Sequence, residues 1–104
     1  MAVQIAEAEV RANVPAALDL FLLNVGRYPT TDEGLAALVE EPTGVNNWNG
    51  PYLKKKTVPK DPWGNDFIYL SPGLQGDFDI ISYGADGVPG GEDENKDINN
   101  WEME

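Results

Sequence analysis

The sequence predicts an α+β fold in which an N-terminal helix packs on a small antiparallel β-sheet. Apolar residues recur at helical spacing in the first part of the chain, and short aromatic and β-branched runs follow only after residue 66. This order, helices first and strands second, is typical of α+β domains. The chain has 104 residues, of which 41% are hydrophobic. That is enough for one modest core, so we expect a single domain spanning residues 1–104.

The main helix is expected at about residues 4–25. Its apolar stripe, at steps of three and four residues, consists of Val14, Leu18, Phe21 or Leu22, and Val25. Pro15 interrupts the pattern, because an interior proline removes a backbone hydrogen bond and clashes with the preceding turn. Either the helix kinks there or Asn13 caps a new start. We expect a regular helix from Pro15 to the stop at Gly26, and fraying before Pro15.

The rest of the chain divides into three parts. Cap-type side chains before an apolar run predict a second, shorter helix at residues 32–40. Residues 45–65 are rich in Asn, Gly, Pro and Lys, and predict an irregular connector held in place by aromatic side chains. Within residues 66–104, the runs 67–70 and 78–83 flank a Pro-Gly turn, which predicts an antiparallel hairpin.

The charge balance excludes several functions. The formal net charge is −11, from 18 acidic and 7 basic residues, so the phosphates of a nucleic acid would be repelled. The sequence has no cysteine and no histidine, so it lacks thiolate chemistry and the usual proton shuttle at neutral pH. The remaining catalytic route is a pair of carboxylates with different acidities, and no feature singles out such a pair. We expect no enzyme activity and no nucleic-acid partner.

An acidic, glycine-rich loop follows the hairpin and predicts a calcium site. From residue 86 onward the acids are Asp86, Glu92, Asp93, Glu94, Asp97, Glu102 and Glu104, and the one base is Lys96. Calcium takes roughly six to eight oxygen ligands, and glycines let a chain turn its carbonyls toward one point. The candidate ligands are the carboxylates of Asp86 and Asp97, the Ser82 hydroxyl and the carbonyls near Tyr83 and Val88, with Asp93 and Asn95 as further candidates. The spacing does not match an EF-hand loop, so a solvated acidic loop without metal remains the alternative.

Two further groups of residues have a structural and a functional interpretation. Lys54, Lys55, Lys56 and Lys60 form a basic cluster in the connector. A run of this kind is usually a solvated face; the alternative is a contact with the acidic surface of a neighbouring copy. Trp48, Trp63 and Trp101 each adjoin turn residues, so we expect them to hold loops on the core. Stacking on a carbohydrate is the alternative.

Several blocks of sequence resemble a known family. They are Gly26-Arg27-Tyr28-Pro29-Thr30-Thr31-Asp32-Glu33-Gly34-Leu35-Ala36-Ala37-Leu38, Pro59-Lys60-Asp61-Pro62-Trp63-Gly64-Asn65-Asp66, Tyr69-Leu70-Ser71-Pro72-Gly73 and Ser82-Tyr83-Gly84-Ala85-Asp86-Gly87. In this order they closely resemble the major pseudopilins of the type II secretion system. The resemblance implies a type IV pilin-like fold, in which the first half of the N-terminal helix is a membrane anchor and the second half supports a globular head.

The resemblance also implies a function and a location. Major pseudopilins polymerise, together with minor pseudopilins, into a periplasmic filament called the pseudopilus. The filament works with inner-membrane components, a cytoplasmic ATPase and the outer-membrane secretin to export folded proteins. No run of about 18 apolar residues occurs in this sequence. We therefore expect the periplasmic head of an inner-membrane protein of a Gram-negative bacterium, without its anchor and monomeric in isolation.

For the acidic loop, the resemblance implies one bound Ca²⁺. Carried over to this sequence, the ligands are Ser82, the backbone of Tyr83, Asp86, the backbone of Val88, and Asp97. Some relatives have a second acid where this chain has Lys96, so a carbonyl, a water, Asn95 or Asp93 would take that place. Two alternatives remain: a calcium-dependent module that captures a secreted protein or a glycan around Trp48 and Tyr52, and a type IV pilin or minor pseudopilin.

Overall fold

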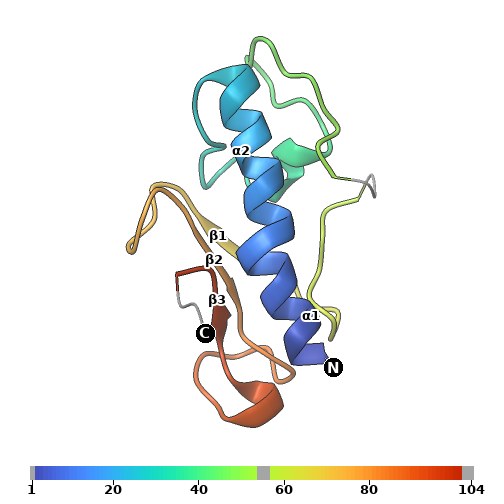
Figure 1. Ribbon diagram of the computed structural model, residues 1–104, viewed down its shortest axis with the longest axis vertical. Helices are drawn as coiled ribbons and strands as arrows, with labels where there is room; N and C mark the ends of the chain where they lie inside the picture. Colours follow the sequence, from blue (N-terminus) through green and yellow to red (C-terminus); the bar gives the residue numbers. More distant parts are fainter. Residues whose placement is uncertain (1, 54–56, 102–104) are drawn as a thin grey trace.

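The computed structural model describes residues 2–53 and 57–101, and of residue 94 only the backbone. A long N-terminal helix lies against one face of a three-stranded antiparallel sheet, and loops extend from both ends of the molecule (Figure 1). This arrangement confirms the predicted α+β class. None of the described helices has the length and apolar character needed to cross a membrane.

The N-terminal helix is continuous over three segments. It runs as α1 (Ala2–Ala8), a π-helical segment η1 (Glu9–Asn13) and α2 (Val14–Val25). It ends at Gly26, as predicted. Gly26 adopts a left-handed φ of 97° and donates its N–H to the Leu22 carbonyl at 2.8 Å. A residue with a side chain would be strained in that conformation, so glycine fixes the end of the helix.

Pro15 does not break the helix, and the predicted fraying before it is wrong. Asn13 has helical backbone angles and makes no capping hydrogen bond; its side-chain amide donates to the Glu9 carboxylate at 2.8 Å. The Val14 N–H donates to the Glu9 carbonyl five residues back, which is the pattern of a π-turn. In an α-helix the proline ring would clash with the carbonyl four residues earlier. The wider π-turn gives the ring room, and the helix continues.

The helix packs on the sheet through one apolar stripe. Its inward residues Val10, Val14, Leu18 and Phe21 have no solvent exposure. The rest of the core consists of Ala6, Ala17, Leu35, Ala37, Leu38, Phe67, Tyr69, Ile80 and Ile98. Full burial of a large aliphatic or aromatic side chain contributes roughly 1.5–3 kcal/mol to folding. The stripe is therefore the main apolar contact between the helix and the rest of the head.

The sheet confirms the predicted hairpin and adds a short third strand. Strands β1 (Ile68–Leu70), β2 (Asp79–Ser82) and β3 (Ile98–Asn99) are ordered β1-β2-β3, and both pairs are antiparallel. Ile80 points into the core. Because side chains alternate along a strand, Ile81 points to the face away from the helix. The sheet thus has one covered face and one open face.

The second helix is a single 3₁₀ turn, η2 (Leu35–Leu38), shorter than the predicted helix at residues 32–40. Thr30 and Glu33 form a reciprocal capping box: the Glu33 N–H donates to Thr30 Oγ1 at 3.1 Å, and the Thr30 N–H donates to Glu33 Oε1 at 2.9 Å. Gly34 then adopts φ 64° and ψ −168°, which lie outside the helical region. Helical structure can therefore begin only after Gly34.

Segments on either side of the connector are joined by hydrogen bonds. The Tyr69 hydroxyl donates to the Pro29 carbonyl at 2.7 Å, and burial raises the pKa of Tyr69 to about 12, so it stays a neutral donor. Thr31 Oγ1 accepts from the Ser71 N–H at 2.8 Å and donates to the Ser71 carbonyl at 3.2 Å. The block that follows the helix is thereby fixed to the end of β1.

Aromatic side chains hold the connector on the core, as predicted. The Trp48 indole N–H donates to the Ala37 carbonyl at 2.7 Å. The Tyr52 ring makes edge contacts with Phe21 and Trp48, with ring centroids 6.0 and 5.6 Å apart. The Tyr52 hydroxyl also accepts the Asn24 side-chain amide at 3.0 Å. These contacts commit Trp48 and Tyr52 to the core, which argues against the alternative of a capture site formed by these two rings.

The basic cluster lies partly outside the described residues, which omit Lys54, Lys55 and Lys56. Lys60 Nζ lies 3.6 Å from the Asp66 carboxylate, and both side chains are exposed. An exposed pair at this distance contributes little to stability, because water and salt screen it. For Lys60, the structure agrees with a solvated face.

Arg11 connects the π-helical segment to the last strand. Its Nε donates to the Asn99 carbonyl at 3.0 Å, and its Nη1 donates to Glu7 Oε2 at 2.8 Å. The Arg11 side chain is only 16% exposed, so these charged bonds are partly shielded from water. The helix therefore holds β3 by a polar contact as well as by packing.

We predict that Arg11→Ala lowers the free energy of unfolding by about 1–3 kcal/mol, because it removes a charge-assisted hydrogen bond and leaves the Asn99 carbonyl without this donor. Urea denaturation followed by circular dichroism measures the loss. Lys60→Ala, which removes only the exposed pair, is the matched control and should change stability far less. Equal losses in the two variants would contradict the assigned role of Arg11.

Candidate metal centre

The predicted site lies on the loop that connects β2 to β3, drawn in orange to red at one end of the molecule (Figure 1). The two ends of this loop meet in the sheet, because Ser82 at the end of β2 is paired with Ile98 at the start of β3. The loop therefore returns beside its starting point. A ligand bound by this loop would therefore lie next to the ends of β2 and β3.

A buried carboxylate holds the start of the loop. Asp61 is 4% exposed, and its Oδ2 accepts the Ser82 hydroxyl at 2.9 Å. Its Oδ1 accepts the backbone N–H groups of Trp63 at 3.1 Å and Asn65 at 2.8 Å. A buried charge is tolerated only when hydrogen bonds replace its hydration, and Asp61 has three donors. Asp61 thereby fixes the connector turn and the end of β2 to each other.

The turn that follows Asp61 also contacts the acidic loop. The Asn65 side-chain amide donates to the Gly84 carbonyl at 3.3 Å, and the Gly84 N–H donates back to Ser82 Oγ at 3.3 Å. Gly87 has a φ of 70° and lies against Asn65, where a Cβ atom would come within 3.3 Å of the amide nitrogen. The left-handed φ favours glycine at residue 87, and a side chain there would also press on the Asn65 amide.

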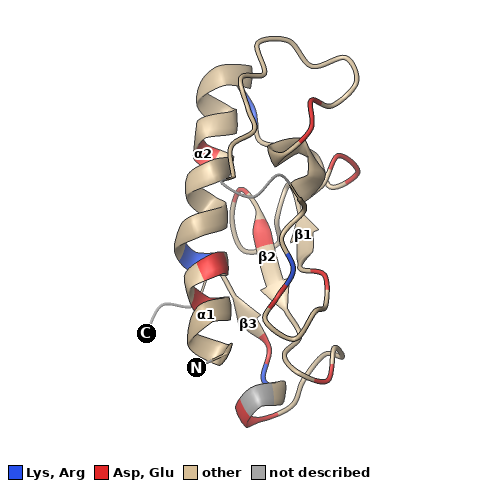
Figure 2. Ribbon diagram, turned by 90° about the vertical axis from the view of Figure 1, so that its right-hand side faces the viewer, with Lys and Arg blue, Asp and Glu red and all other residues tan. Residues whose placement is uncertain are grey.

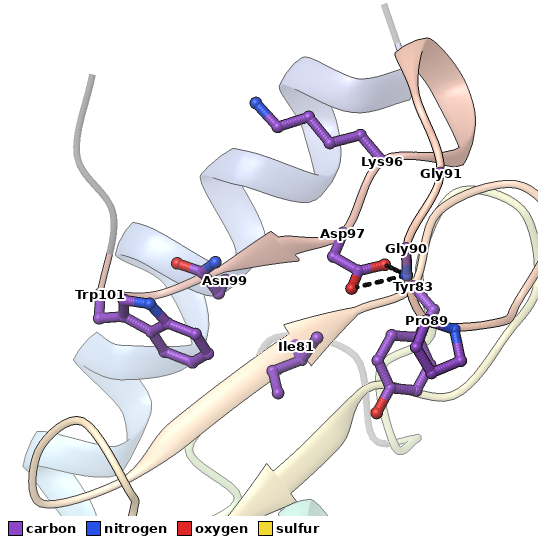
Figure 3. A pocket seen from close by; sticks show the side chains of 9 residues that line it. All are labelled: Ile81, Tyr83, Pro89, Gly90, Gly91, Lys96, Asp97, Asn99 and Trp101. Carbon is purple, nitrogen blue, oxygen red and sulfur yellow. Dashed lines mark hydrogen bonds between the residues drawn. The ribbon is translucent and has the colours of Figure 1, made fainter.

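A second carboxylate closes the far part of the loop. Both oxygens of Asp97 accept the Gly90 N–H at 3.0 Å (Figure 3). Gly91 follows with φ 102°, and a Cβ atom there would collide with the Asn95 carbonyl of the short 3₁₀ turn η3 (Asp93–Asn95). Asp97 therefore ties the two arms of the loop together across a tight bend.

The structure brings only some of the predicted ligands together. Tyr83 and Asp97 line one depression of about 550 Å³, together with Ile81, Pro89, Gly90, Gly91, Lys96, Asn99 and Trp101 (Figure 3). Ser82 is fully buried beside Asp61. Asp86 and Val88 lie on an exposed turn, where the Val88 N–H donates to Asp86 Oδ1 at 3.3 Å. Among the described side chains, which do not include that of Glu94, no three acidic groups converge on one point.

The oxygen donors of this loop are of the chemical type that a hard cation binds. A carboxylate offers about four acceptor positions, and one N–H occupies part of the capacity of Asp97. Asp86 and the carbonyls of Tyr83 and Val88 add further hard oxygens, which calcium prefers. The Ser82 hydroxyl gives its proton to Asp61 and accepts from Gly84, so its main role in this structure is to hold the loop.

Asp61 is the residue at this site that the sequence analysis missed. Two signals could have identified it. An aspartate followed by proline, with glycine and asparagine a few residues later, is typical of a turn in which the carboxylate accepts backbone N–H groups. The serine at the end of β2 also needs a partner, because buried hydroxyls are nearly always hydrogen-bonded.

The fold and this loop define a class of protein. A long N-terminal helix laid over a small antiparallel sheet, with an acidic glycine-rich loop before the last strand, is the architecture of a type IV pilin-like head. The sequence model described as "Type II secretion system (T2SS), protein G" matches residues 2–101. The chain belongs to this family, whose members are structural subunits and not enzymes.

Individual relatives agree with the family assignment. The chain is 49% identical over 104 residues to type II secretion system core protein G of Pseudomonas aeruginosa, covering 96% of this chain and 71% of that protein. It is 50% identical over 91 residues to the protein of the same name from Vibrio cholerae, covering 85% of this chain and 61% of that protein. The chain thus spans 71% of the first relative and 61% of the second.

A solved structure agrees as well. The crystal structure of the major pseudopilin from the type 2 secretion system of enterohaemorrhagic Escherichia coli superposes with a TM-score of 0.80 at 39% identity, and the match covers 96% of this chain and 82% of that one. The predicted resemblance to major pseudopilins is therefore confirmed. These matches favour a major pseudopilin over the alternative of a type IV pilin or a minor pseudopilin.

We predict that Asp61→Ala lowers the free energy of unfolding by about 3 kcal/mol, because one buried donor and two partly buried donors lose their carboxylate acceptor. Ser82→Ala should cost about 1–3 kcal/mol in the unmodified background. In the Asp61→Ala background it should cost much less, since its partner is already gone. Urea denaturation of the four proteins in this double-mutant cycle measures the coupling, and strictly additive losses would contradict the Asp61–Ser82 contact.

Proposed function

We propose that this chain is the periplasmic head of a major pseudopilin, which polymerises with further copies and with minor pseudopilins into the pseudopilus. The filament would extend from the inner membrane toward the secretin and drive the export of folded proteins. The observation that carries the proposal is the match to a solved major pseudopilin over 96% of the chain. The absence of histidine and cysteine from the sequence agrees with a structural role.

We further propose that the loop between β2 and β3 binds one Ca²⁺ ion. The ligands would be Asp86, Asp97, the carbonyls of Tyr83 and Val88, and Ser82. When bound, the ion supplies positive charge and several coordination positions to a segment in which acids predominate. The protein supplies the frame: Asp61 holds one end of the loop, and the Asp97 bond to Gly90 holds the other.

Charge supports a role for the cation in assembly. With a formal net charge of −11, copies of the head repel one another at short range, and acidic segments are spread over the molecule (Figure 2). A divalent ion reduces this repulsion at the loop, where the acids are most concentrated. Calcium would therefore favour both a fixed loop and the approach of a second copy.

Metal removal tests the site. A ligand that binds only the folded state stabilises it by about 2.7 kcal/mol when its free concentration is a hundredfold above its dissociation constant. We expect calcium to raise the melting temperature of the chelator-treated chain, and Asp97→Asn, which keeps an acceptor for Gly90, to abolish most of that rise. Asp32→Asn, an exposed acid outside the loop, should leave the rise unchanged. An equal calcium response in all three proteins would refute the assigned ligands.

Secretion tests the function. In the bacterium that encodes this chain, deleting the gene for the full-length protein should retain type II substrates in the periplasm, and restoring the gene should return them to the medium. Immunoblots of the two fractions measure the distribution. Normal export in the deletion strain, under conditions in which loss of the secretin blocks export, would contradict the proposed function.

A further inference from the structure

We propose that the turn between β1 and β2 is a pre-formed contact element, whose exposed Leu74 inserts into the depression on the open sheet face of a second copy of this chain. The inference rests on the proposed assembly of copies and names one contact within it. It depends on three observations: how Leu74 is presented, what lines the depression, and how charge is placed around each.

Hydrogen bonds to the backbone of its turn hold Leu74 in a position exposed to solvent. Its side chain is 86% exposed, the highest value among the large hydrophobic residues described. Its N–H donates to Asp79 Oδ2 at 2.7 Å, and the next N–H, of Gln75, donates to Asp79 Oδ1 at 3.3 Å. Asp79 is only 2% exposed, so a buried carboxylate is devoted to the backbone of this turn.

The rest of the turn is equally constrained. The Gly73 N–H bonds to the Gly76 carbonyl at 3.1 Å, and a Cβ atom at Gly73 would collide with the Asp79 carboxylate. Thr31 fixes Ser71 at the base of the turn by two hydrogen bonds. An apolar side chain on a rigid turn loses little entropy when it is buried by a partner, which is the property of an interface anchor.

The depression on the open sheet face provides an apolar receptor. Ile81 points away from the helix, and Tyr83, Pro89 and Trp101 lie around it (Figure 3). Trp101 remains 38% exposed. The outer face of an antiparallel sheet that faces water is usually polar, so these exposed or half-buried apolar side chains indicate a contact surface. The volume of about 550 Å³ leaves ample room for one leucine side chain.

The placement of charge favours another copy as the occupant, although the Asp97 carboxylate, bonded to Gly90, also lines the depression. Exposed Asp77 lies in the same turn as Leu74, whereas exposed Lys96 lies on the rim of the depression. Lys96 makes no ion pair with any residue in the described ranges. An acid beside the anchor and a base beside the receptor would attract each other across the contact.

The placement of the two elements predicts a contact that repeats. The turn that carries Leu74 precedes β2, whereas Tyr83 and Pro89, which line the depression, follow β2. Leu74 and this part of the depression therefore lie at opposite ends of the strand. A contact between different surfaces of identical subunits is heterologous, and it generates rings or open filaments instead of closed dimers. The proposed contact is therefore of the kind that a filament requires.

Disulfide trapping tests the contact, because the chain contains no native cysteine. Chains carrying Leu74→Cys and chains carrying Pro89→Cys are mixed with calcium under mild oxidation. We expect a covalent heterodimer, since the two Cα atoms of a disulfide must approach within about 7 Å. Leu23→Cys is the control for Leu74→Cys, because Leu23 is 78% exposed on α2 and should give only background cross-linking with Pro89→Cys.

A second set of variants tests the geometry and the charges. The chain with both Leu74→Cys and Pro89→Cys should give a ladder of covalent oligomers. Asp77→Lys should slow trapping, and adding Lys96→Glu should restore it. With Leu74→Ser in the full-length protein, association measured by filament assembly should weaken roughly ten- to a hundredfold, as expected for the loss of one buried leucine.

The outcomes separate this contact from the proposed function. If wild-type filaments form but the Leu74–Pro89 pair is trapped no faster than the Leu23 control, the contact is refuted and the function stands. A double-cysteine chain that gives only closed dimers also refutes it. If the pair is trapped as a ladder but export does not need the protein, the contact stands and the function fails. Melting curves of each variant verify that the heads are folded.

Discussion

The structure depends most on the buried carboxylate of Asp61. It joins the connector turn, the end of β2 and the first residues of the acidic loop, three segments that no regular secondary structure connects. Its oxygens accept the Ser82 hydroxyl and the N–H groups of Trp63 and Asn65. This contact adds to the short pairing of β2 with β3 and to the bond from the Asn65 amide to the Gly84 carbonyl, which also attach the loop to the head.

Asp61 also explains why a long irregular connector can support a defined loop. Connectors of this length contribute few regular hydrogen bonds, so their position must be fixed by individual side chains. Here Trp48 and Tyr52 fix the first part against the helix, and Asp61 fixes the last part against the sheet. Arg11 then holds the returning strand from the helix side. The loop is thus anchored from both layers of the fold.

Much of the fold could be predicted from the sequence, because the main elements follow from local patterns. The apolar stripe predicted the helix, Gly26 its end, and the aromatic and β-branched runs the hairpin. The length of the second helix was predicted wrongly, since the cap-type side chains before the apolar run suggest a longer helix than the non-helical backbone of Gly34 permits. The fraying before Pro15 was also wrong, because a single π-turn, which has no sequence signature, accommodates the ring.

The candidate site was predictable only in part. Acid content and glycines identified the loop, and the resemblance supplied the proposed ligands. The contacts that position the loop join residues 19 to 88 apart in sequence, as with Arg11 and the Asn99 carbonyl. Such pairs depend on how the helix docks on the sheet, and the hydrophobic periodicity of the sequence does not reveal that docking. The Leu74 turn was not predicted to be rigid, although its main contact is local: Asp79, five residues further along the chain, accepts the Leu74 N–H.

Hydrogen exchange of single backbone amides tests the central role of Asp61 most directly. In the wild-type chain, the amides of Trp63, Asn65 and Gly84 should exchange slowly and as one group, because one buried carboxylate and its serine partner hold all three. In Asp61→Ala, all three should exchange much faster, while the Ile80 amide, which is bonded to the Asn100 side chain, should keep most of its protection. Unchanged protection of Gly84 in that variant would contradict the account.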